Sequence, residues 1–394
     1  MSVQRPIYLD YHATTPVDPR VLAEMLPYFT EQFGNPASRQ HAWGWEADKA
    51  VDRARRQIAQ LINASPPEIV FTSGASESNN LALKGAVARL HARGRRIVTV
   101  ATEHKSVLDA CRHLESDGFE VHRLGVGPDG LVDLDAVRQA VTPGTILVSV
   151  MAANNEIGTL QPLAEIGAIA HERGALFHSD AAQGAGKIPI DVQAMQIDLL
   201  SLTGHKLYGP KGCGALFVRR KDPRVEIAPQ IDGGGQEAGI RSGTLNVPGI
   251  VGLGRAVEIC REEMPGESAR LAALRDRLLD GLRARAGDVR VNGTLERRLP
   301  HNLHVTFDHV QGEALLMALG DLAVSTGSAC SSGSQAPSHV LQAIGATGPA
   351  AGASIRFGLG RGTTESEVDF AIERVAAVVT HLRSSNPSSR IPSR

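Results

Sequence analysis

The chain has little of what marks several classes of protein. Aromatic residues make up 4% of its 394 residues, and 41 Lys+Arg against 42 Asp+Glu leave a formal net charge of −1. Without a basic excess or many rings for base stacking, we expect no direct nucleic-acid partner. No stretch approaches the roughly 18 apolar residues that would cross a membrane, so we expect no membrane partner.

Cysteine is also scarce. Only four occur, Cys111, Cys213, Cys260 and Cys330, and no two form a CxxC pair. This spacing argues against a zinc ribbon and a disulfide framework, and we expect no bound metal. Residues 1–10 lack the apolar run of a secretory signal peptide. Isolated thiols are typical of a reducing compartment, so we expect a cytoplasmic protein.

What the chain does have is glycine, 41 residues, and an alternation of short apolar strands with amphipathic helices. Repeated strand–helix units predict an α/β fold with a mostly parallel sheet covered by helices on both faces. The predicted strands lie near 68–71, 97–101, 119–124, 145–151, 175–178, 198–202 and 215–219, and the predicted helices near 47–62, 80–91, 107–116, 134–140 and 163–173.

The sequence changes character past residue 260. An Ala/Leu/Arg-rich amphipathic helix is predicted near 268–286, and the elements after it suggest a smaller α+β domain. We therefore expect two domains and a flexible Ser/Pro/Arg-rich tail. The predicted strands lie near 303–307 and 354–357, and the helices near 313–319 and 365–382. The large domain would comprise residues 15–260, the small domain residues 1–14 and 261–383, and the tail residues 384–394.

Three strings resemble known motifs but fit them poorly. Residues 125–130 match the dinucleotide pattern GxGxxG, but they include a Pro-Asp-Gly turn signature and no acidic residue follows at the expected distance. Residues 204–211 resemble a P-loop interrupted by Pro210, without the Ser or Thr that should follow. His301 and His304 suggest a metal site, but in an alternating strand we interpret them as surface or packing histidines.

Polar clusters follow the predicted strands where each strand ends. In a parallel sheet the ligand lies at the carboxyl ends of the strands, so we expect these clusters to face one crevice. They occupy residues 73–80, 102–106, 154–159, 180–183 and 203–206.

Four features of these clusters suggest cofactor chemistry, although each has a plainer explanation alone. Lys206 follows an apolar strand, where shielding favours Schiff-base chemistry, although a surface lysine is the simpler reading. Asp180 ends a strand, where it could pair with a protonated pyridine nitrogen or cap a helix. Residues 73–76 open a helix and could cradle a phosphate or serve only as an N-cap. His104 could stack on a ring or shuttle protons. Together they indicate pyridoxal 5'-phosphate (PLP).

Further strings, in order along the chain, carry a family resemblance. They are Tyr8–Pro16, Gly34–Ser38, Thr72–Asn79, Thr102–Lys105, Asn154–Gly158, Ser179–Gln183, Gly204–Lys206, Gly233–Glu237, Arg241–Thr244, Ser325–Cys330 and Arg356–Arg361. On these residues the chain resembles the cysteine desulfurases of the NifS/IscS type, in the class V aminotransferase group. The resemblance implies PLP fold type I, a large domain with a mostly parallel seven-stranded sheet and a small α+β domain.

The resemblance also implies a role for individual residues. Lys206 would hold PLP covalently, Asp180 would pair with its pyridine nitrogen, and Gln183 would bond its phenolic oxygen. His104 would stack on the ring and take part in catalysis. The phosphate would be held by Ala75, Ser76, Thr203 and His205. In a homodimer, Thr244 would reach the phosphate bound to the neighbouring subunit. The substrate carboxylate would be bound by Asn155 and Arg356, and Asn155 would also lie beside the cofactor.

Cys330 differs from the other three cysteines in its surroundings. It lies in a small, polar run from 325 to 335 that predicts a flexible loop, whereas Cys111, Cys213 and Cys260 suit buried packing positions. The resemblance implies that Cys330 takes sulfur from L-cysteine as a persulfide, releasing L-alanine. The sulfur would pass to an acceptor such as an iron–sulfur scaffold protein or a tRNA thiolation relay.

Two other functions remain possible at this point. One is another class V PLP enzyme, such as a small-substrate aminotransferase or a selenocysteine lyase. The other is a non-catalytic sulfur-assembly scaffold. The thiol of Cys330 argues against a plain aminotransferase, and the presence of both Lys206 and Cys330 argues against a scaffold.

Overall fold

The structure is a computed structural model that describes residues 6–326, 338–347 and 349–385. Its central sheet has seven strands: β2 (Ile69–Thr72), β3 (Arg96–Val100), β4 (Glu120–Leu124), β5 (Thr145–Ser149), β6 (Leu176–Asp180), β7 (Leu199–Thr203) and β8 (Gly214–Val218). Their order is β2-β8-β7-β6-β5-β3-β4, and β8 alone runs antiparallel to its neighbours. The predicted α/β fold with a mostly parallel sheet is confirmed.

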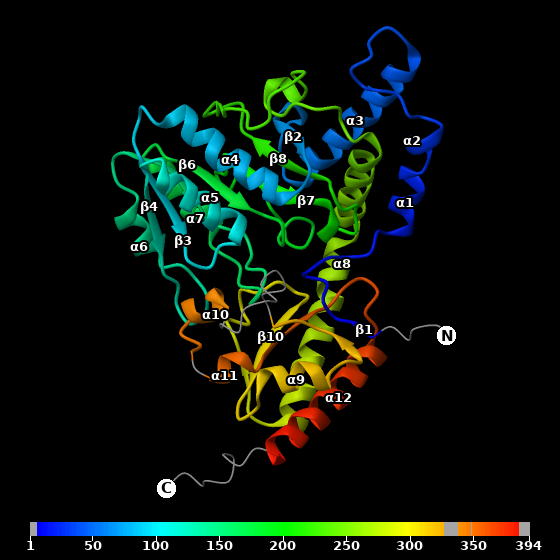
Figure 1. Cartoon of the computed structure of the whole chain (residues 1–394), viewed down its shortest axis with the longest axis vertical. Coiled ribbons are helices and arrows are strands. Elements are labelled where there is room, and N and C mark those ends of the chain that lie inside the picture. Colours follow the sequence, from blue (N-terminus) through cyan, green and yellow to red (C-terminus); the bar gives the residue numbers. More distant parts are fainter. Residues whose placement is uncertain (1–5, 327–337, 348, 386–394) are drawn as a thin grey trace.

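Helices cover both faces of this sheet (Figure 1). One face packs against α4 (Ala75–Leu90) and α5 (Lys105–Ser116). The other packs against α1 (Pro19–Met25), α3 (Ala42–Leu61), α6 (Leu134–Ala140), α7 (Leu163–Glu172) and the first half of α8 (Val247–Ala286). Neighbouring residues of a strand point to opposite faces of the sheet. Ile97 of β3 packs with the residues of α4 and α5, whereas Val98 packs with those of α3 and α7 on the other face. The short helix α2 (Pro27–Thr30) follows α1.

A second, smaller body contains a three-stranded antiparallel sheet in the order β12-β10-β9. Its strands are β9 (Val289–Val291), β10 (Asn302–Phe307) and β12 (Ser354–Gly358), and a parallel pair joins β1 (Ile7–Tyr8) to β11 (Leu322–Ala323). Its helices are α9 (Gly312–Ala318), α11 (Pro349–Gly352) and α12 (Glu365–Ser384), whereas α10 (His339–Ala343) packs against Ile157 of the large body. The first and last parts of the chain both contribute to its hydrophobic core, which includes Leu9 and Val379.

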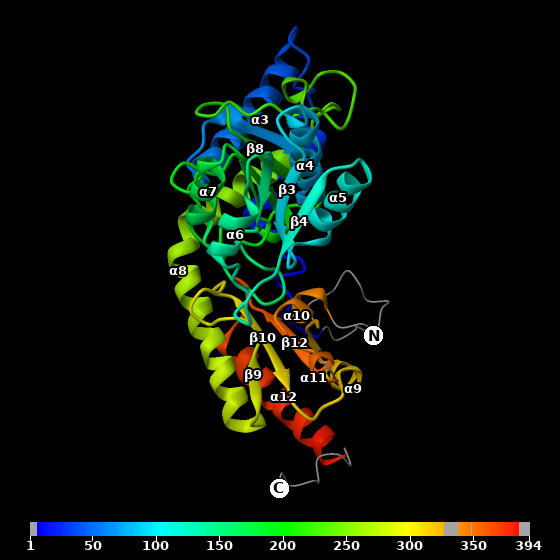
Figure 2. The ribbon, with the colours of Figure 1, turned by 90° about the vertical axis from the view of Figure 1, so that its left-hand side faces the viewer.

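The long helix α8 lies beside both bodies (Figures 1 and 2). The prediction of a helix confined to 268–286 was wrong, because α8 begins at Val247 and continues through Pro265 for 40 residues. Its first half packs on the large core through Ile250 and Leu253, and its second half on the small core through Leu278. The domain boundary proposed at residue 260 therefore falls inside one helix.

Two other predictions changed in detail. The helix expected from about residue 80 begins at Ala75, because Gly74 adopts a φ of 151° that lets the chain turn directly from β2 into α4. The two histidines near β10 are packing residues rather than surface ones, since His301 and His304 are 3% and 0% exposed.

Among the described residues, no helix has the length and apolar character needed to cross a membrane.

Candidate active site

A cavity of about 500 Å³ lies at the carboxyl ends of the central strands. Every polar cluster singled out in the sequence contributes to its lining, so the expectation of one shared crevice is confirmed. The predicted site residues that line it are Ala75, Ser76, His104, Asn155, Asp180, Gln183, Thr203, His205 and Lys206. A volume of this size is ordinary for a cofactor or small-molecule site.

One end of the cavity suits an anion. The N-terminus of α4 opens there without a side-chain cap, and a Cβ added at Gly74 would lie 3.5 Å from the Thr203 hydroxyl. Burial, together with the charges of Lys206 and Lys211, lowers the pKa of His205 to about 4, so its ring is neutral near pH 7. Backbone amides at a helix start, with nearby hydroxyls, fit the phosphate of PLP.

The cavity lining also presents a buried carboxylate. Asp180, the last residue of β6, is 4% exposed. Its Oδ2 accepts a hydrogen bond from Asn79 Nδ2 at 2.7 Å, and its Oδ1 accepts one from the Ala182 backbone N–H at 2.8 Å. Both donors are neutral, so a positively charged ligand atom would compensate the buried charge. A protonated pyridine nitrogen fits that requirement.

His104 caps the start of α5 with its side chain. Its Nδ1 accepts a hydrogen bond from the Ser106 backbone N–H at 3.2 Å and lies 2.8 Å from the Ser106 hydroxyl. Burial lowers the pKa of His104, and the charge of Asp180 opposes this shift only in part. The ring is therefore neutral near pH 7 with its proton on Nε2, a state that suits stacking on a flat ligand.

Lys206 ends a short 3-10 turn (Gly204–Lys206) that the N-terminal segment holds in place. The Thr15 hydroxyl donates to the His205 carbonyl at 2.9 Å and accepts from the Tyr208 backbone N–H at 2.9 Å. Tyr208 itself has a φ of 61°, an uncommon conformation for a bulky residue. The backbone on both sides of Lys206 is thus fixed by the same threonine.

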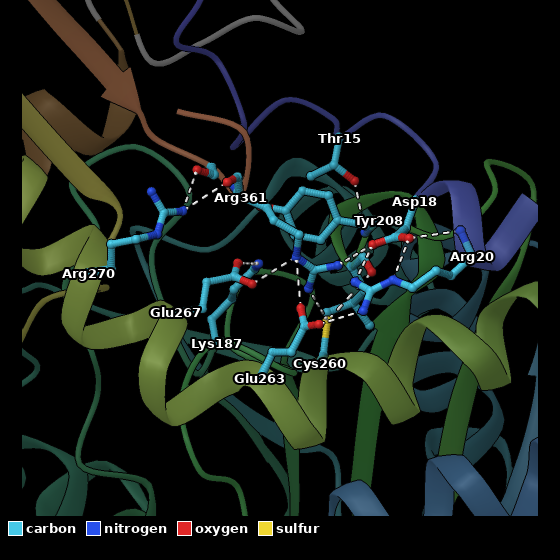
Figure 3. A network of polar contacts seen from close by, with 12 residues as sticks. Thr15, Asp18, Arg20, Lys187, Tyr208, Cys260, Glu263, Glu267, Arg270 and Arg361 are labelled. Atoms are coloured by element: carbon cyan, nitrogen blue, oxygen red, sulfur yellow. Dashed lines mark hydrogen bonds and ion pairs between the residues drawn. The ribbon is translucent and has the colours of Figure 1, made fainter. Parts of the chain in front are cut away.

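Charged side chains surround Tyr208 (Figure 3). Lys187 Nζ and Arg361 Cζ lie 4.3 and 4.2 Å from its ring centroid, and the Arg361 backbone N–H donates to its hydroxyl at 2.7 Å. Arg361 also pairs with Asp18 at 2.6 Å and with Glu267 at 2.9 Å. We call Asp18, Lys187, Tyr208, Glu267 and Arg361 the ionic cluster. It connects the segment after Lys206 to α8 and to the loop after β12.

The pKa values within the ionic cluster follow from these contacts. Hydrogen bonds from Arg20 and Arg361 hold the pKa of Asp18 well below its usual value. Burial raises the pKa of Glu267, but the charges of Lys187 and Arg361 outweigh it and leave that pKa lowered. Both carboxylates are therefore ionised in the folded protein near neutral pH.

Among the predicted site residues that the structure describes, two lie outside the cavity lining. Arg356 is 2% exposed, and its guanidinium bonds Asp10 Oδ1 and the Asn155 carbonyl, both at 2.7 Å. It therefore contacts the backbone of a lining residue, Asn155, without lining the cavity itself. Thr244 is exposed and does not line this cavity, so its predicted role depends on a neighbouring subunit.

The cysteines divide as the sequence suggested, as far as the described residues reach. Cys111, Cys213 and Cys260 are buried free thiols, and burial raises the pKa of Cys111 and of Cys213 to about 12. Thiols of that kind are poor nucleophiles. Cys330 lies outside the described residues, and its role stays a prediction.

Several residues near the cavity had no role in the sequence interpretation. Asn79 holds Asp180, Asp10 pairs with Arg356, and His12 bonds Gln183. Burial, followed by the charge of Asp180, raises the pKa of Glu103 well above its usual value, and its Oε1 accepts from the Met151 amide at 2.6 Å. Asn79 lies four residues after Ala75, on the same helix face, and that spacing is the signal that could have identified it.

Comparisons with known proteins identify close relatives. Residues 7–370 match the family described as Aminotransferase class-V. A protein named cysteine desulfurase IscS, from Anaeromyxobacter sp. (strain K), is 57% identical over 382 residues, covering 97% of this chain and 94% of the relative. A solved structure described as a NifS-like protein has 39% identity and a TM-score of 0.89, covering 96% of this chain and all (100%) of that one. Another, described as SspA in complex with cysteine, has 42% identity and a TM-score of 0.79, covering 90% and 98%.

Proposed function

The chain belongs to the aminotransferase class-V family, and from that premise we propose that it is a PLP-dependent cysteine desulfurase. It converts L-cysteine to L-alanine and transfers the sulfur to acceptors. The observation that carries this proposal is the convergence of Lys206, Asp180 and His104 on one cavity that also holds the N-terminus of α4. A relative named for this activity and a related structure in complex with cysteine support it.

Each wall of the cavity suits one part of the cofactor. Lys206 would hold PLP covalently, and Asp180 would compensate the charge of its pyridine nitrogen. His104 would stack on the ring, Gln183 would bond the phenolic oxygen, and Asn155 would lie beside them. Ala75, Ser76, Thr203 and His205 would hold the phosphate, together with Thr244 of the neighbouring subunit. When bound, PLP supplies a sink for the electrons released at the substrate α-carbon.

The protein side chains supply binding and proton transfer. Arg356 and Asn155 would bind the substrate carboxylate, and Asp10, which accepts a hydrogen bond from Arg356, would orient the guanidinium. Lys206 Nζ would take the proton from the substrate Cα. Lys206 or His104 Nε2 would then return protons to the product.

Sulfur transfer requires a second nucleophile, which we assign to Cys330. Its Sγ forms a bond to the substrate sulfur while the substrate Cβ–S bond breaks. One cysteine and one thiol thus become one alanine and one persulfide, so atoms and electrons balance without an external oxidant. The persulfide then passes its outer sulfur to an acceptor.

We also propose the setting in which the enzyme works. Thr244 is exposed and does not line its own cavity, which supports a homodimer in which it completes the neighbouring site. The three described cysteines are free thiols, which supports a reducing, cytoplasmic location. An iron–sulfur scaffold protein or a tRNA thiolation relay would accept the sulfur.

The proposal is tested by mass spectrometry of the full chain after incubation with L-cysteine. We expect one extra sulfur on Cys330, none in Cys330→Ser, and none in Lys206→Ala. Sulfur found only on Cys111, Cys213 or Cys260 would contradict the assignment. A Cys330→Ser protein that releases alanine at the parent rate would favour another class V enzyme, and protein that stays colourless with added PLP would favour a scaffold.

A further inference from the structure

A buried chain of hydrogen bonds leads from the small body to the cavity. Arg298 Nη1 donates to Asn302 Oδ1 at 2.8 Å, and Asn302 Nδ2 lies 3.0 Å from His12 Nε2. His12 Nδ1 lies 3.1 Å from Gln183 Oε1, and Gln183 Nε2 donates to the His12 carbonyl at 3.0 Å. All four side chains are buried, and Gln183 lines the cavity.

Arg298, the first residue in this series of hydrogen bonds, sets which group donates in each of the others. Arginine can only donate, so the oxygen of Asn302 must face it and the amide nitrogen must face His12. That nitrogen donates, so His12 Nε2 accepts and the ring carries its hydrogen on Nδ1. The Nδ1–H group then requires the oxygen of Gln183, which turns the Gln183 nitrogen toward the His12 carbonyl.

This arrangement leaves one amide hydrogen of Gln183 available to a ligand. The Gln183 amide nitrogen carries two, and the His12 carbonyl takes one. Within the described residues no protein acceptor takes the second. Gln183 therefore presents a donor to the cavity.

The charge state of His12 supports a fixed direction. Burial lowers the pKa of His12 well below its usual value, and the charges of Arg356, Lys206 and Lys187 lower it further. The ring of His301 contacts the ring of His12, with 4.4 Å between the centroids and a tilt of 30° between the planes. A neutral ring has one donor and one acceptor, as the chain requires.

We propose that His12 is a positioning residue, set by Arg298 through Asn302, that fixes the amide of Gln183 so that it donates a hydrogen bond to the phenolic oxygen of PLP. The inference rests on the proposed function for the identity of the acceptor. The hydrogen-bond chain itself depends only on residues of this protein. The N-terminal segment and the small body thereby determine how a large-body residue meets the cofactor.

The first test measures the protonation of His12 within the hydrogen-bond chain and does not depend on enzyme activity. In the full-length protein with its cofactor, labelled with ¹⁵N-histidine, we expect His12 to hold its hydrogen on Nδ1 from pH 6 to 8. The missing signal in His12→Phe identifies the residue. In Asn302→Asp the donor becomes an acceptor, so we expect a hydrogen on His12 Nε2. A parent ring protonated on Nε2, or an unchanged ring in Asn302→Asp, would overturn the proposal.

The second test reads the cofactor. We expect His12→Phe to weaken PLP binding about fivefold, the effect of one neutral hydrogen bond, and to move the pH midpoint of the cofactor absorbance upward by roughly 0.7 unit. Other groups near the site, Lys206, Asp180, His104 and His205, are unchanged in this variant. The matched control is His301→Phe, which alters a neighbouring buried ring outside the chain and should leave the midpoint unchanged.

The two tests separate the possible failures. Equal midpoints in His12→Phe and the parent, or equal shifts in His12→Phe and His301→Phe, would overturn the positioning role even if the enzyme is active. A protein that binds no PLP would overturn the proposed function, whereas the tautomer of His12 would still report on the hydrogen-bond chain.

Discussion

Two regions join the N-terminal segment to the rest of the protein, and they use opposite kinds of contact. The ionic cluster around Tyr208 relies on full charges, with Arg361 bound to both Asp18 and Glu267. The contacts between His12 and its partners Gln183 and Asn302 are between uncharged groups. Both regions connect the small body to the large one.

The difference shows what each kind of contact can specify. An ion pair is strong when desolvated, but it tolerates several geometries and does not determine the orientation of an amide. A chain of neutral donors and acceptors has only one consistent direction once its first donor is fixed. The ionic cluster therefore holds the loop after Lys206, and the hydrogen-bond chain orients Gln183.

The largest effect on stability is expected in the ionic cluster. Arg361→Ala would remove the cation shared by the buried carboxylate of Asp18 and the half-buried carboxylate of Glu267, leaving each with one weaker set of partners, and should lower the free energy of unfolding by about 3 kcal/mol. Urea unfolding followed by circular dichroism measures this. The control is Arg277→Ala, which removes a pair with Asp369 at the surface and should change little. Equal losses in the two variants would remove the distinction between this cluster and an ordinary surface pair.

The pH dependence of stability should separate the two regions. The pKa of His12 is lowered on folding, so its contribution is complete above the unfolded value of about 6.5 and is lost as the pH falls below it. The lowered pKa values of Asp18 and Glu267 act in the same direction, but only below about pH 4.

We therefore expect His12→Phe to reduce the loss of stability between pH 7 and pH 5 by about 2 kcal/mol, the binding of one proton. Arg361→Ala should leave the slope in that range unchanged. Urea unfolding at a series of pH values gives both slopes. Parallel curves for His12→Phe and the parent would mean that folding does not lower the pKa of His12.

The smallest effect is expected for Lys187→Met. The methionine keeps most of the buried volume, and Glu267 retains Arg361 as a partner. The loss of the cation–π contact with Tyr208 and of the 3.3 Å pair with Glu267 should cost about 1 kcal/mol. If Lys187→Met lowered the free energy of unfolding as much as Arg361→Ala does, Lys187 and Arg361 would contribute equally, contrary to what their contacts predict.

The sequence predicted the wall of the cavity well because the wall follows from local rules. Asp180 and Thr203 end strands of a parallel sheet, and the carboxyl ends of such strands meet at one edge. The α/β class followed from the same alternation of strands and helices. None of these inferences required knowledge of a distant contact.

The contacts of His12 could not be predicted in this way. Its partners Gln183 and Asn302 are 171 and 290 residues away, and nothing in the local pattern pairs them. The burial of His304 was equally open, because an alternating strand does not reveal that β10 is the middle strand of its sheet. The start of α8 was missed because its first half is apolar on several sides and packs on a different core from its second half.

The length of α8 has a consequence for how the protein unfolds. At about 1.5 Å per residue its 40 residues form a rod of roughly 60 Å that supplies side chains to both hydrophobic cores. Loss of either core would leave half of this helix without packing, where its intrinsic helical stability is small. The two bodies are therefore cooperatively linked, and the chain should melt in a single transition rather than domain by domain.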